Sequence, residues 1–123
     1  MLTAPAPHPR SYAYCSDTAY NTSIAEQIKG VDLLYHEATF LSDKAVRAEQ
    51  TFHSTAKQAA SIAKQAHAGQ LLLGHISARY TDASPLLEEA KAVFENTIIV
   101  QDGKSYEVYP SQINKNQSDS YRI

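Results

Sequence analysis

Residues 55–75 read TAKQAASIAKQAHAGQLLLGH and carry the strongest structural signals in this sequence. Alanines recur at helical spacing over 56–68, which predicts a helix with a shallow face that can lie close on a sheet. Thr55 and Gln58 fit a capping box at the start of that helix. Residues 71–73, three consecutive leucines, follow as a short strand that is apolar on both faces, as a covered parallel strand should be. This order predicts an α/β fold.

The alternation of strands and helices extends along the chain in both directions. We expect a mainly parallel or mixed sheet with helices packed on it. An Asp-Gly pair between two β-rich segments predicts a terminal β-hairpin that adds an antiparallel edge. The expected strands are 11–16, 31–36, 71–73, 97–100 and 105–108. Three helices are expected: a short one capped by Thr22 or Ser23, the alanine helix from Ala56, and one capped by Ser84 with Pro85 in the first position.

Length and composition limit the class of protein. The chain has 123 residues, a formal net charge of −2 and a hydrophobic fraction of 43%, which are values for one globular domain. They exclude a highly basic nucleic-acid arm and an acidic disordered tail. No apolar run approaches the length of a membrane helix. Cys15 is the single cysteine, so a disulfide framework within the chain is excluded and a reducing cytoplasm is the expected compartment.

Acidic and imidazole side chains follow successive expected strands. Asp17 follows the first, His36 and Glu37 close the second, and His75 follows the leucine strand. In α/β sheets, ligands and catalytic groups gather outside the carboxyl ends of strands. His53 precedes the start of the alanine helix and adds a further candidate. These residue types suit zinc and similar ions, so the pattern indicates a site at this edge of the sheet.

Each of these residues also has a structural interpretation. Asp17 could be a turn or cap residue, His75 a hydrogen-bonded packing residue, and His53 a polar neighbour of the Thr55 cap. His36 is interpreted as structural. A catalytic zinc site needs at least three protein ligands, and the spacing of the residues indicates no unambiguous third. The pattern alone therefore leaves the alternatives open.

Four segments together resemble one known family. Tyr14–Thr18 resembles the Y-S-G-D-T segment of ribonuclease Z, the metallo-β-lactamase-fold endonuclease that matures the 3′ ends of transfer RNA. Residues 36–39 match its H-E-A-T motif, and residues 53–55 match its H-S-T motif. Residues 72–80, LLGHISARY, resemble its L-x-H-x-S-x-R-Y segment. The motifs occur in the family's order and span roughly residues 11–109.

The resemblance implies roles for particular residues. Asp17 would bridge two zinc ions and His75 would bind one of them. His53 would protonate the leaving oxygen, with Glu37 orienting its ring. Ser77, Arg79 and Tyr80 would help to shape or anchor the RNA end. Zinc is the implied metal, manganese also suits such a site, and the implied substrate is a transfer RNA precursor.

The chain departs from the family in two ways. Ser16 stands where the family has glycine, which matters if that position needs a positive φ. The H-x-H-x-D-H motif, which supplies most zinc ligands, is absent, as is the arm that grips transfer RNA. The chain thus resembles the carboxy-terminal half of an αββα sandwich, and Met1 is then an internal methionine, the start of a truncated frame or a cloning boundary.

The expected organisation follows from this half-domain. Residues 1–10 form an extended lead-in, 11–109 the half-domain and 110–123 a polar tail. A missing amino-terminal half or self-association, most simply as a homodimer, would cover the exposed surface. The chain alone would be inactive, although the whole protein would be a nuclease. The alternatives are a non-catalytic or partner-completed half-domain and a metallo-β-lactamase-fold hydrolase with another substrate.

Overall fold

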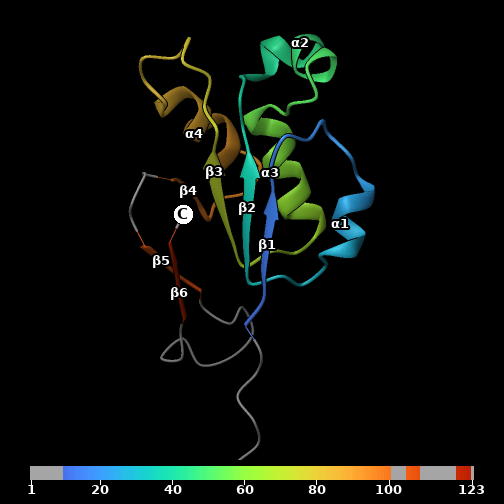
Figure 1. The fold of residues 1–123 in the computed structure, drawn as a ribbon, viewed down its shortest axis with the longest axis vertical. Helices are drawn as coiled ribbons and strands as arrows, with labels where there is room; N and C mark the ends of the chain where they lie inside the picture. Colours follow the sequence, from blue (N-terminus) through green and yellow to red (C-terminus); the bar gives the residue numbers. More distant parts are fainter. Residues whose placement is uncertain (1–9, 101–104, 109–118, 123) are drawn as a thin grey trace, which may run out of the picture.

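The computed structural model describes residues 10–100, 105–108 and 119–122, and its centre is a sheet of four parallel strands (Figure 1). Across the sheet these are β1 (Tyr12–Cys15), β2 (Leu33–Glu37), β3 (Gln70–Gly74) and β4 (Thr97–Ile99). The connections hold α1 (Ser23–Gln27), the 3-10 helix η1 (Ser42–Lys44), α2 (Ala45–Gln50), α3 (Ala56–Gln65) and α4 (Ser84–Lys91). The α/β prediction is confirmed.

Helix α3 is the helix that the alanine pattern predicts. The Thr55 side chain accepts a hydrogen bond from the Gln58 amide at 3.1 Å, and the Gln58 side chain accepts one from the Thr55 amide at 2.9 Å. The predicted capping box is therefore confirmed. Its buried face carries four small side chains, which let the helix lie close on the sheet, and one large one, Ile62; the small ones are Ala56, Ala59, Ala60 and Ala63. The helix ends before His67, which takes a left-handed conformation with a φ of +54°.

Both faces of the sheet are buried in the described part of the chain. Leu34, Leu71 and Leu73 pack with the alanines of α3 and with Leu86 and Ala90 of α4. Residues one position away point to the other face, where Leu33, Tyr35 and Leu72 form a second, smaller cluster. The consecutive leucines are thus divided between two cores, as expected of a covered parallel strand.

The Tyr35 side chain of β2 packs closely against Gly74 at the end of β3. The Tyr35 ring lies over Gly74 so closely that a Cβ there would stand 2.1 Å from the tyrosine hydroxyl. Tyr35 also stacks on Tyr14 of β1, with ring centroids 4.3 Å apart. Burial, followed by the neighbouring Tyr14, raises the pKa of Tyr35 to about 12. This stack ties β1, β2 and β3 together just below their carboxyl ends.

The predicted terminal hairpin is wrong in its pairing. Residues 97–99 form β4, which pairs parallel with β3, while β5 (Ser105–Val108) pairs antiparallel with β6 (Asp119–Arg122) in a separate sheet. The four-stranded sheet is therefore parallel throughout. Helix α4 supplies the crossover that parallel pairing of β4 requires, and this outweighs the local Asp-Gly signal. The Asp-Gly turn itself lies outside the described residues, and β6 falls within the segment expected to be a polar tail.

The start of α4 differs by one residue from its prediction. Ser84 is the first residue of the helix rather than its cap; the cap position is held by Ala83, which makes no side-chain capping bond. The Asp82 carboxylate instead accepts a hydrogen bond from the Ser84 amide at 2.9 Å. Asp and Ser are both good capping residues, so the sequence alone did not separate them. None of the described helices is long and apolar enough to cross a membrane.

His36 lies inside the sheet as a fully buried imidazole, with 0% of its surface exposed. Its Nδ1 is 2.8 Å from the Glu37 carbonyl oxygen, which can only accept, so Nδ1 donates. Its Nε2 has no hydrogen-bond partner among the described residues. Burial is the main cause that lowers the pKa of His36, so the fold disfavours the charged form of this ring.

The buried His36 predicts a pH-dependent stability. Below its ordinary pKa of about 6.5, the unfolded chain binds a proton that the folded chain rejects. The free energy of unfolding should therefore fall, from this residue alone, by up to about 1.4 kcal/mol per pH unit as pH drops from 6.5 toward the lowered pKa. His36→Asn keeps a donor for the Glu37 carbonyl but cannot titrate. Urea unfolding of both proteins at pH 8 and pH 5 should show a smaller loss in the variant.

The control is His67→Asn, at an exposed histidine beyond the end of α3. This variant should keep the pH dependence of the unsubstituted chain. If His36→Asn and the unsubstituted chain lose the same stability between the two pH values, the neutral buried imidazole is not responsible.

Candidate functional site

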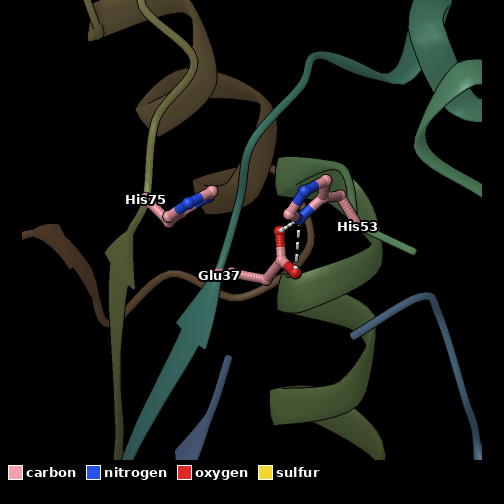
Figure 2. Close-up of side chains that lie close together, drawn as sticks. All are labelled: Glu37, His53 and His75. Carbon is pink, nitrogen blue, oxygen red and sulfur yellow. Dashed lines mark hydrogen bonds and ion pairs between the residues drawn. The ribbon is translucent and has the colours of Figure 1, made fainter. Parts of the chain in front are cut away.

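Three side chains from separate segments converge at the carboxyl edge of the sheet. Glu37 ends β2, His75 follows β3, and His53 precedes the amino terminus of α3 (Figure 2). One ligand atom from each lies within 4.8 Å of those of the other two. This is the edge at which the sequence predicted a site, and these are three of the residues that it named.

The Glu37 carboxylate is fully buried and accepts hydrogen bonds from every side. Its Oε1 is 2.6 Å from the Thr18 amide, and its Oε2 is 2.5 Å from the Thr39 hydroxyl and 3.3 Å from the Ser54 amide. His53 Nδ1 lies 3.0 Å from both carboxylate oxygens. The backbone amides can only donate, so the group is used as an acceptor on both oxygens.

His53 is held in one orientation by this carboxylate. Because the Glu37 oxygens accept, His53 Nδ1 donates, and Nε2 is the ring nitrogen that can bond to another group. The side chain is 22% exposed, so solvent or a substrate can reach it. A carboxylate that orients an imidazole with a free Nε2 is the arrangement of a general acid–base pair.

His75 is exposed and lies across the site from His53. Their rings are 5.1 Å apart and nearly parallel, at 22°. Its Nδ1 is 2.9 Å from the Thr39 hydroxyl. The backbone of His75 has a φ of +57°, a left-handed conformation that side-chain-bearing residues adopt at a cost.

Asp17 lies at the carboxyl end of β1, but its carboxylate is not one of the three groups brought together. The residue is exposed and has a φ of +52°. Ser16, which replaces the glycine of the family motif, has no positive φ, so the left-handed position is the aspartate itself. The neighbouring Thr18 amide anchors this loop to Glu37. The role of Asp17 as a ligand stays a prediction.

The residues predicted to touch RNA lie just after His75. The Tyr80 hydroxyl accepts a hydrogen bond from the Leu41 amide at 2.9 Å, and the Ser77 hydroxyl accepts one from the Arg79 amide at 3.3 Å. The Arg79 guanidinium lies 5.1 Å from the centre of the Phe40 ring. Arg79 is exposed and can reach a ligand, whereas Ser77 and Tyr80 shape the segment that carries it.

Sequence reasoning did not single out three residues that build the site. Thr18 and Ser54 supply amides to Glu37, and the Ser54 hydroxyl donates to the Thr18 carbonyl at 2.5 Å. Thr39 connects Glu37 to His75. Each stands inside a motif that was quoted, but hydroxyl and amide contacts depend on tertiary position and leave no signal in spacing. Cys15 packs beside the larger core, and burial raises the pKa of its thiol, which suits its prediction as a small hydrophobe.

The three convergent side chains could hold a metal ion, since imidazoles and a carboxylate are suitable ligands. Their contacts divide them, however. The two Glu37 oxygens and His53 Nδ1 are occupied with one another and with backbone donors. His75 has a ring nitrogen, Nε2, with no hydrogen bond in the described structure. The arrangement therefore combines an acid–base pair with one clear metal-ligand candidate.

Comparisons with known proteins agree with this architecture. A family model described as "Beta-lactamase superfamily domain" matches residues 6–76. The ribonuclease Z of Porphyromonas gingivalis is 61% identical over 97 residues, which are 79% of this chain and 32% of that protein. The chain spans about a third of the length of the curated relatives it matches.

Solved structures share the fold. The metallo-β-lactamase fold protein YhfI from Bacillus subtilis superposes with a TM-score of 0.65 at 32% identity, over 72% of this chain and 35% of that one. A long form RNase Z from yeast superposes with a TM-score of 0.53 at 32% identity, over 56% of this chain and 9% of that one. The resemblance inferred from the four motifs is thus confirmed by relatives named ribonuclease Z, and the chain belongs to the β-lactamase superfamily, as a part of a metallo-β-lactamase fold.

Proposed function

We propose that this chain is part of a zinc-dependent endoribonuclease that cleaves the 3′ trailer from transfer RNA precursors. The observation that carries the proposal is the pair formed by the buried Glu37 and the partly exposed His53, beside His75 at the carboxyl edge of a parallel sheet. The family motifs around these residues and relatives that bear the name ribonuclease Z support the choice of substrate. Because the chain spans about a third of those relatives, the activity belongs to the complete protein.

His53 is the proposed general acid. With Nδ1 donating to Glu37, its Nε2 is the ring nitrogen left to give a proton to the leaving oxygen of a cleaved phosphodiester. Glu37 is a positioning residue in this scheme. It is fully buried behind the ring and touches four donors, so it holds the imidazole rather than meeting the substrate.

His75 and Asp17 are the proposed metal ligands from this chain. Zinc is the proposed metal because imidazole nitrogen and carboxylate oxygen suit it, and manganese accepts the same donors. A pair of such ions, when bound, activates water and stabilises charge on phosphoryl oxygens. The Thr18–Glu37 hydrogen bond holds the Asp17 loop beside the site, which supports its inclusion. The exposed Arg79 guanidinium is the proposed contact for an RNA phosphate, with Ser77 and Tyr80 shaping its segment.

The missing ligands must come from outside the chain. A covalently continuous amino-terminal half is the first source, and association with a second copy is the other. Among the described strands, β1 lies at the edge of the sheet, and its Tyr14 is 59% exposed. An edge strand with an exposed aromatic is a surface on which further chain can pack. The reducing cytoplasm remains the proposed compartment, because the lone Cys15 is a half-buried free thiol.

His53→Ala in the complete protein should retain metal and lose turnover. Removing a general acid typically costs about 10²–10⁴-fold in rate, and His53 Nδ1 is committed to Glu37 rather than to a metal. Single-turnover cleavage of a precursor transfer RNA, with metal content measured on the same sample, checks both parts.

The matched control is His67→Ala, which removes an exposed histidine outside the site. It should cleave like the unsubstituted protein. Full turnover by His53→Ala would show that His53 is not the acid. Faster cleavage of a small phosphodiester than of precursor transfer RNA would favour a hydrolase of the same fold with another substrate.

The isolated chain should not cleave precursor transfer RNA, with or without added zinc. A catalytic zinc site takes three protein ligands, and this chain offers His75 and Asp17. The assay compares the chain with the complete protein at equal concentration. Robust cleavage by the isolated chain would mean that its own residues complete the site.

The isolated chain should also self-associate through the β1 edge. Light scattering after size exclusion should give the mass of a dimer, and Tyr14→Glu should shift it to the monomer because a charge then replaces an exposed aromatic. Phe52→Glu is the control, since Phe52 is 72% exposed but lies away from β1, in the loop between α2 and α3. A monomeric unsubstituted chain would leave the amino-terminal half as the proposed partner of this edge.

A further inference from the structure

The hydroxyl of Thr39 lies between the candidate metal ligand and the buried carboxylate. Thr39 Oγ1 is 2.9 Å from His75 Nδ1 and 2.5 Å from Glu37 Oε2. The side chain is almost completely buried, with 5% of the residue exposed. A single hydroxyl thus contacts both His75 and Glu37, and it links the two residues through two hydrogen bonds.

Counting protons fixes the direction of both hydrogen bonds. A hydroxyl carries one proton and two lone pairs. The Glu37 carboxylate accepts from the amides of Thr18 and Ser54, so it also accepts from the hydroxyl, which uses the hydroxyl's proton. Thr39 Oγ1 can then only accept from His75. The Nδ1 of His75 must therefore carry a proton, and its Nε2 in the neutral ring is left with a lone pair.

The backbone around Thr39 holds this hydroxyl in place. The Thr39 amide donates to the Ser54 carbonyl at 3.0 Å, and the Thr39 carbonyl accepts from the Ser77 amide at 3.1 Å. These bonds tie the residue to the loop before α3 and to the segment after His75. The His75 ring has no comparable anchor: it is exposed, and its described contacts are Thr39 and the face of His53.

We propose that Thr39 is a positioning residue that sets the tautomer of His75 and aims its Nε2 lone pair at a divalent cation. Metal-binding histidines usually donate their other ring N–H to a carboxylate, a carbonyl or a water. Here a threonine hydroxyl accepts the hydrogen bond from that N–H and donates its own hydrogen bond to Glu37. One continuous chain of hydrogen bonds, His75–Thr39–Glu37–His53, then orients the metal ligand and the acid from the same buried carboxylate. The inference rests on the proposed function for the role of His75 as a metal ligand and for the identity of the cation.

The test compares three variants of the chain labelled with ¹⁵N at histidine, without metal. Thr39→Val keeps the shape of the side chain and removes the hydroxyl, and Thr39→Ser restores it. Thr18→Val is the matched control, because Thr18 also adjoins Glu37 but its hydroxyl donates to the Ala19 carbonyl. Two-bond ¹H–¹⁵N correlation spectra at about pH 8.5, above the ordinary histidine pKa of about 6.5, report which ring nitrogen carries the proton.

We expect His75 to be protonated at Nδ1 in the unsubstituted chain, in Thr39→Ser and in Thr18→Val. In Thr39→Val the ring should lose this preference and shift toward the Nε2–H form or a mixture. The His53 signals should keep their Nδ1–H pattern in all four proteins, because His53 bonds to Glu37 directly, and this shows that the site remains folded. Nδ1 protonation of His75 that persists in Thr39→Val would overturn the proposal.

A second measurement uses Zn²⁺ alone with the complete protein. Thr39→Val should weaken Zn²⁺ binding by about 10–100-fold, the usual effect of losing a partner behind a metal-binding histidine, and Thr39→Ser should bind within a few fold of the unsubstituted protein. Equal affinities of Thr39→Val and the unsubstituted protein would also overturn the proposal. If the complete protein binds Zn²⁺ in this pattern but does not cleave precursor transfer RNA, the proposed function fails and the role of Thr39 stands.

Discussion

The site depends on one buried carboxylate. Placing a charged Glu37 inside the protein is costly unless its oxygens are fully hydrogen-bonded. The donors come from different parts of the chain: the loop after β1, the segment after β2, and the loop before α3. Losing any one of these contacts leaves the buried charge with too few hydrogen bonds, which lowers the free energy of unfolding by roughly 1–3 kcal/mol or more. The carboxylate therefore forces the three segments to meet at one point, and the site forms where they meet.

The surrounding fold makes that meeting point rigid. Small side chains let α3 lie directly on β2 and β3, and its capping box fixes where the helix begins. His53 stands two residues before that cap, so its position follows from the start of the helix. On the other face, the Tyr35 ring on Gly74 fixes the end of β3 and hence the point at which His75 leaves the sheet. The packing of the two cores thus aims both histidines at the same place.

Sequence patterns predicted what depends on local chemistry and on the parallel sheet. The capping box at Thr55, the leucine strand and the convergence of Glu37, His53 and His75 were all accessible, because the carboxyl ends of parallel strands share one edge. The pairing of β4 could not be predicted. An Asp-Gly signal reports only local turn preference, whereas the parallel pairing of β4 with β3 depends on the crossover through α4. The Thr39 contacts were also out of reach, since a hydroxyl's partners are fixed only by the folded chain.

The two halves of the site differ in how complete they are within this chain. The proposed acid–base half is complete: His53, Glu37 and the donors that bond to the carboxylate all belong to the described residues. The proposed metal-binding half is open, with an exposed His75 and an exposed Asp17, both held in left-handed conformations. Such conformations cost of order 1–3 kcal/mol each and persist where neighbours enforce them. Thr18 and Thr39 both hydrogen-bond to Glu37. Thr18 follows Asp17 directly in the sequence, and the Thr39 hydroxyl contacts His75. Hydrogen bonds to the buried carboxylate therefore help to hold these two exposed residues in place, which is what their proposed role as one part of a metal site requires.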